Sequence, residues 1–94
     1  MPIRSFRHKG LRRLAEDGDP SGLPAAQVRK LTHMLTLLET AEVPEDMGLF
    51  PGWRLHRLSG NLAGFWSLTV TGNWRLVFRM AGGEALDVDP VAHH

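Results

Sequence analysis

The chain of 94 residues contains no cysteine, so disulfide bonds and metal sites built on thiolates are excluded. It also lacks any apolar run close to the roughly 20 residues that span a bilayer. The first ten residues, MPIRSFRHKG, have no apolar stretch of the kind found in a secretory signal peptide. These absences predict a cytoplasmic protein with no membrane segment.

Acidic residues are missing from Met47 through Gly83, a stretch that holds four arginines. The net charge of the chain is only +1, but nine of its eleven Lys and Arg residues are Arg. Arginine presents a planar fork of five donors that suits phosphate recognition. The pattern favours a phosphate-bearing partner, and a solvated basic surface without a partner remains the alternative.

Two helices are expected in the first half. Residues 8–18 form a short amphipathic pattern that ends at Gly18, and residues 24–41 form a longer one with apolar residues at three- and four-residue steps. Pro24 fits the first turn of the second helix. Residues 2–6 alternate and predict a short N-terminal strand, with Ile3 and Phe6 on opposite faces.

The last forty residues predict an antiparallel meander with strands at 53–58, 65–70, 74–80 and 85–89, joined by short connections rich in Gly and Asn. Helices that precede a run of antiparallel strands indicate an α+β fold of two layers. With 43% hydrophobic residues, the chain has enough apolar material for one domain over residues 1–94.

Alternation along the strands predicts that one face of the sheet is apolar and the other basic. If the helices cover the apolar face, the other face presents a set of cationic, imidazole and hydroxyl side chains: Arg54, His56, Ser67, Thr69, Arg75 and Arg79. Such a face can hold a phosphodiester. RNA brings its own nucleophile, the ribose 2′-OH, so cleavage needs proton transfer and charge stabilisation, which His and Arg supply.

Five segments resemble, in order and over nearly the whole chain, the HigB-type toxins of the RelE/ParE superfamily: SFRHKGLRRLAEDG, GLPAAQVRKL, WRLHRLSG, GFWSLTVTGNWRLVFR and DVDPVAHH. The resemblance implies a RelE-like fold, a HigA-type helix-turn-helix antitoxin as partner, and cleavage of mRNA in the ribosomal A site. It implies no cofactor and no metal.

The resemblance also implies roles for single residues. His56 matches the histidine of the family segment LHPLKG, Arg75 matches the phosphate-clamping arginine of NWR, and His94 matches a C-terminal histidine. Arg54, Arg57, Ser59 and Arg79 are the candidate RNA-contacting residues around them.

The chain departs from the family pattern at two positions. Ser59 stands where the family has a catalytic lysine, and we hypothesise that Arg57, two residues earlier, partly restores the lost cation. His93 stands in place of a tyrosine, and it predicts an imidazole in the proton-transfer role. The pair His93–His94 is alternatively the remnant of an affinity tag.

Two other functions are compatible with the same residues. The first is a non-catalytic inhibitor, such as a ParE-like gyrase poison. The second is a degenerate toxin that acts only as a corepressor with its antitoxin. The presence of His56, Arg75 and His94 favours the ribosome-dependent endoribonuclease.

Overall fold

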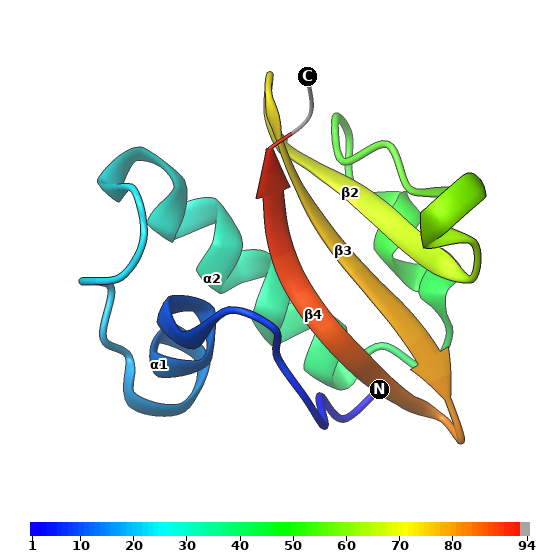
Figure 1. Cartoon of the computed structure of the whole chain (residues 1–94), viewed down its shortest axis with the longest axis horizontal. Helices are drawn as coiled ribbons and strands as arrows, with labels where there is room; N and C mark the ends of the chain where they lie inside the picture. The colour runs from blue at the N-terminus through cyan, green and yellow to red at the C-terminus, as the bar shows by residue number, and fades with distance from the viewer. Residues whose placement is uncertain (93–94) are drawn as a thin grey trace.

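The computed structural model describes residues 1–92, and it has two layers (Figure 1). The helices α1 (Lys9–Asp17) and α2 (Ala25–Thr40) lie on one side of a four-stranded antiparallel sheet. The predicted α+β class is confirmed. No helix in the described part of the chain is long and apolar enough to cross a membrane.

The first helix is fixed at both ends by residues of the HKGL and EDG motifs. His8 is the N-cap, and its Nδ1 accepts the Leu11 N–H at 3.1 Å. Gly18 ends the helix in the left-handed conformation at φ 68°, where glycine carries no steric penalty. Gly10 packs against the backbone of Gly22, so closely that a Cβ built on Gly10 would lie 2.6 Å from the Gly22 carbonyl oxygen.

The second helix supplies most of the core from the helical layer. Its buried stripe contains Leu31, Met34, Leu35 and Leu38, which recur as the 3.6-residue period requires. The N-terminal amine of Met1 donates to the carbonyls of Glu39 and Ala41, where a positive charge is favourable at a helix C-terminus.

The sheet has the order β1-β2-β3-β4, with β1 at His56–Arg57, β2 at Phe65–Thr71, β3 at Trp74–Ala81 and β4 at Glu84–Ala92. Two-residue turns join the last three strands. Gly82 and Gly83 both have positive φ, as a tight hairpin between β3 and β4 requires. Leu68, Val70, Leu76 and Phe78 form the sheet side of the core beneath the helices.

The N-terminal segment runs parallel to β4 and not as a continuous strand. It makes isolated bridges from Ile3 to Ala85 and from Phe6 to Val88. Ile3 and Phe6 both pack against the core, so the expectation that they lie on opposite faces is wrong. The reason is that the two bridges are three residues apart, which breaks a strict two-residue alternation.

The strand expected at 53–58 is shorter in the structure. Arg54 has φ 48°, in the left-handed region that strands do not use, and only His56 and Arg57 pair with β2 in the ladder. The chain still follows β2 before the break, because the Thr69 N–H donates to the Trp53 carbonyl at 2.7 Å. Short 3₁₀ turns, η1 (Pro44–Leu49) and η2 (Gly60–Leu62), lie before and after this segment.

Candidate functional site

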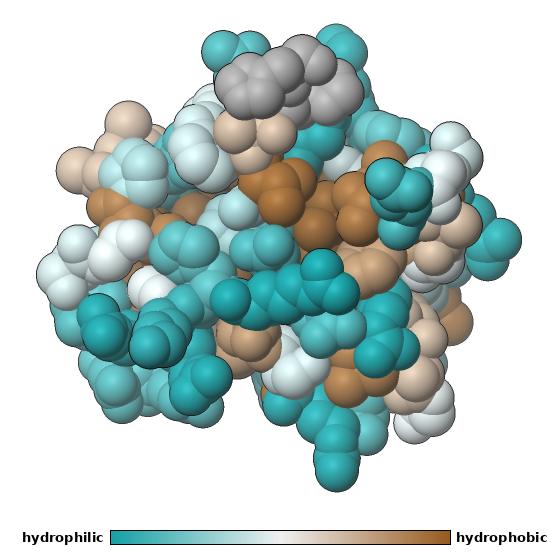
Figure 2. Space-filling view, in the orientation of Figure 1, coloured by the Kyte–Doolittle hydropathy of each residue, from teal (hydrophilic) through white to brown (hydrophobic). Residues whose placement is uncertain are grey.

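The sheet face away from α2, hereafter the open face, carries the predicted site. Residues paired across neighbouring strands point to the same side of a sheet. The register therefore places two adjacent rows on the open face: His56, Ser67, Val77 and Asp89 in one, and Thr69, Arg75 and Val91 in the other. Figure 2 shows hydrophilic side chains across this face and an apolar area near the end of β4.

His56 lies exposed on the edge strand with a defined tautomer. Its Nδ1 is 3.0 Å from the Arg54 carbonyl oxygen, and a carbonyl can only accept, so Nδ1 carries the proton of the neutral ring. The left-handed backbone of Arg54 accompanies this contact. The Nε2 lone pair of neutral His56 is therefore the one available to accept a proton.

Arg75 is half-buried on β3, and its Nη1 donates to Thr69 Oγ1 at 2.8 Å on the neighbouring strand. The ladder pairs the same two residues, so the side-chain bond lies directly across the two strands. No ion pair within residues 1–92 neutralises Arg75. The open face thus holds one oriented guanidinium, with its charge uncompensated by a contacting carboxylate.

Ser67 lies on the open face as predicted, but the expectation that this face presents its hydroxyl is wrong. Its side chain is fully buried, with 0% exposure, and its Oγ has no hydrogen-bond partner. Among the described residues it is the one buried side-chain polar atom left unpaired. The alternation predicts the correct face for Ser67, but it does not predict that the hydroxyl is buried.

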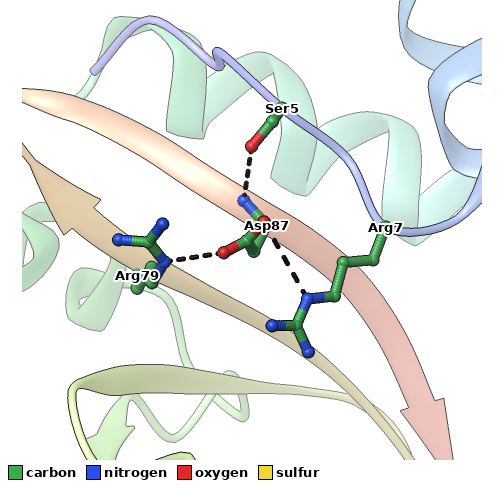
Figure 3. Close-up of polar contacts among 4 residues, drawn as sticks. All are labelled: Ser5, Arg7, Arg79 and Asp87. Atoms are coloured by element: carbon green, nitrogen blue, oxygen red, sulfur yellow. Dashed lines mark hydrogen bonds and ion pairs between the residues drawn. The ribbon is translucent and has the colours of Figure 1, made fainter.

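Arg79 lies at the other end of the open face in a polar cluster (Figure 3). Its Nε donates to Asp87 Oδ2 at 2.6 Å, and Arg7 Nε lies 3.9 Å from Asp87 Oδ1. The Asp87 N–H donates to Ser5 Oγ, and Asp87 itself has φ 53° at an irregularity in β4. One carboxylate thus offsets part of the predicted basic charge.

Asp89 also lies on the open face, where it pairs with Val77, and it is not among the predicted site residues. Burial raises the pKa of its carboxyl above the ordinary value of 3.8, and the charges of His8 and Arg7 oppose this rise. The sequence does contain a signal for it, because Asp87 and Asp89 lie two residues apart in the strand predicted at 85–89. Among residues 1–92, no three His, Asp or Glu side chains gather as a metal site would.

The remaining predicted residues are not brought together with this group. Arg57 pairs with Trp66, on the side opposite His56, and its guanidinium lies 4.8 Å from the centre of the Trp66 ring. Ser59 is exposed at the start of η2 and caps it with no side-chain hydrogen bond. His93 and His94 lie outside the described residues, which end at Ala92 beside Trp74.

The family described as RelE-like toxin of type II toxin-antitoxin system HigB matches residues 4–93. The chain belongs to this HigB toxin family. It is 37% identical over 92 residues to a Proteus vulgaris protein named endoribonuclease HigB, covering 98% of this chain and 99% of that protein. It is 34% identical over 88 residues to toxin HigB-1 of Vibrio cholerae, covering 90% and 93%.

Solved structures place this HigB-family chain in the RelE-like fold. A mutant of YafQ from E. coli superposes with a TM-score of 0.64 at 17% identity, over 96% of this chain and 92% of that one. A YoeB/ParE toxin from Agrobacterium tumefaciens gives 0.58 at 17% identity, over 100% and 99%. Membership in a toxin–antitoxin family implies an antitoxin protein as partner.

Proposed function

We propose that this HigB-family toxin is a ribosome-dependent endoribonuclease that cleaves mRNA in the A site. The name of the Proteus vulgaris relative supports the nuclease activity. The observation that carries the proposal is Arg75, a half-buried guanidinium on the open face, oriented by Thr69 and joined to no carboxylate among residues 1–92. A phosphate with its charge at this position would gain a charge-assisted bidentate contact.

The proposed chemistry is attack by the ribose 2′-OH on the adjacent phosphate, without a metal. His56 Nε2 accepts the 2′-OH proton, because the Arg54 carbonyl holds the other ring nitrogen in its protonated form. Arg75 stabilises the charge that develops on the phosphorane oxygens. We assign protonation of the leaving 5′-oxygen to His93 or His94 from their sequence positions.

Partner and location follow from the same proposal. A HigA-type helix-turn-helix antitoxin would neutralise the toxin, and the ribosome with mRNA would be its target. Such a toxin acts in the cytoplasm. The exposed Arg54, next to the edge strand, and Arg79 would make secondary contacts to RNA, with Arg79 contributing less because Asp87 holds its Nε.

The test is primer extension on mRNA from a translating extract. Wild-type protein should produce discrete cuts that require translation, and Arg75→Ala should lower their rate by about 100-fold or more, as loss of one preorganised donor does. Arg29→Ala, an exposed arginine on α2, is the matched control and should leave the cuts unchanged. Arg57→Ala should cost no more than a few-fold, since Arg57 lies over Trp66 on the other side of the sheet.

Intact mRNA in the presence of folded wild-type protein would contradict the nuclease. It would move the assignment to a non-catalytic inhibitor, such as a gyrase poison, or to a corepressor. A large loss of cleavage in Arg57→Ala would instead support the hypothesis that Arg57 replaces the family lysine absent at Ser59.

A further inference from the structure

The buried hydroxyl of Ser67 has no structural partner. Its backbone belongs to the β2 ladder, paired with His56 on one side and Val77 on the other. Its Oγ makes no hydrogen bond although the side chain has 0% exposure. An unpaired buried hydroxyl destabilises a protein relative to an apolar group of the same size, so packing alone would favour alanine here.

The position of Ser67 is the centre of the proposed site. His56 is its direct cross-strand neighbour, and such neighbours have Cβ atoms about 5 Å apart. Thr69 follows two residues later on the same face, roughly 6.6 Å along the strand, and its hydroxyl holds Arg75. Ser67 therefore lies between the imidazole and the guanidinium that the proposed reaction uses.

We propose that Ser67 is an RNA-binding residue, whose hydroxyl donates a hydrogen bond to the substrate at the scissile phosphodiester. This inference rests on the proposed endoribonuclease function. Arg75 is attached on its side-chain end by one hydrogen bond to Thr69. Because the Ser67 side chain has 0% exposure, this contact requires the groups around it to move when RNA binds, while Thr69 continues to hold Arg75. The hydroxyl of Ser67 gains its partner only with substrate, which favours the bound and reacting states.

Two substitutions separate this role from a structural one. Ser67→Ala removes the hydroxyl and keeps the small volume, so the melting temperature should rise by about 4–8 °C while the cleavage rate in the translating extract falls about 10- to 100-fold. Ser67→Thr keeps the hydroxyl and adds a methyl group to a filled site, so it should melt lower than wild type yet cleave faster than Ser67→Ala. Between the two variants, the one with the lower melting temperature would then be the one that cleaves faster.

The matched control is Thr32→Ala, which removes a hydroxyl that bonds within α2 at the Val28 carbonyl. It should not change the cleavage rate. Wild-type-like cleavage by Ser67→Ala would overturn the role of Ser67 and leave the nuclease assignment standing. Activity that follows melting temperature in both Ser67 variants would overturn it as well, as a structural effect. No cleavage by wild type would overturn the proposed function first, and this inference with it.

Discussion

At the scale of single residues, alternation and register account for what the sequence could and could not predict about the site. His56, Thr69 and Arg75 lie on one face because β2 and β3 are regular between them. Asp89 shares that face, but its strand contains a left-handed residue, Asp87, so simple counting along β4 does not give the full arrangement. The face of Ser67 follows from alternation, whereas its complete burial depends on three-dimensional packing that alternation along one strand does not describe.

Asp89 gives a prediction about pH at the same scale. Burial raises its folded-state pKa above 3.8, so its contribution to stability is most favourable when the carboxyl is protonated and is lost as pH rises through the folded pKa. Asp89→Asn stays neutral at every pH. The variant should therefore unfold at a higher urea concentration than wild type at about pH 7, with the difference shrinking as the pH approaches 3.8.

The control for net charge is Glu42→Gln, because Glu42 is exposed in the loop after α2. It should not reproduce the gain at neutral pH. Equal urea midpoints for Asp89→Asn and wild type at about pH 7 would show that His8 and Arg7 fully compensate the buried carboxylate.

At the scale of elements, the helices and the hairpins were predictable because their signals are local. The apolar stripe of α2, the Gly18 stop of α1 and the Gly82–Gly83 turn each lie within a few residues of sequence. The prediction for 53–58 is wrong in its length because Arg54 adopts a left-handed conformation that a Trp-Arg-Leu alternation does not reveal. The HKGL motif, a marker of the family resemblance, has a role in the fold through the His8 cap and the contact of Gly10.

Gly10 carries the prediction at this scale. A Cβ at this position would meet the Gly22 carbonyl oxygen at 2.6 Å and carbon at 2.9 Å, and both are backbone atoms. Gly10→Ala should destabilise the protein by about 1–3 kcal/mol, despite the better helix propensity of alanine, because the loop before α2 must shift. Chemical denaturation would measure the change. Gly72→Ala, whose Cβ meets nothing within 4 Å, is the matched control, and a similar loss in both variants would refute the packing argument.

At the scale of the whole molecule, arginines gather on or beside the open face, although both helices carry cations as well. The helices lie on the other side of the sheet, and three arginines have a defined place on or beside the open face: Arg75 with Thr69, and Arg7 and Arg79 with Asp87. The net charge of +1 conceals this arrangement, since acidic residues such as those at 42–46 lie in the loop that follows α2. Binding to an RNA surface should thus depend on one face and not on total charge.

The salt dependence of ribosome binding tests whether recognition depends on the open face. Each phosphate contacted by Arg or Lys releases counterions, so the affinity of the toxin for ribosomes should fall steeply with added salt. Removing a side chain that contacts a phosphate should lower the slope of log affinity against log salt by about 1, and Arg75→Ala is expected to do so. Arg29→Ala removes the same charge from the exposed side of α2 and should leave the slope unchanged. Equal slopes for the two variants would mean that ribosomes attract the protein by its overall charge. This result would contradict the claim that the open face is the surface that binds RNA.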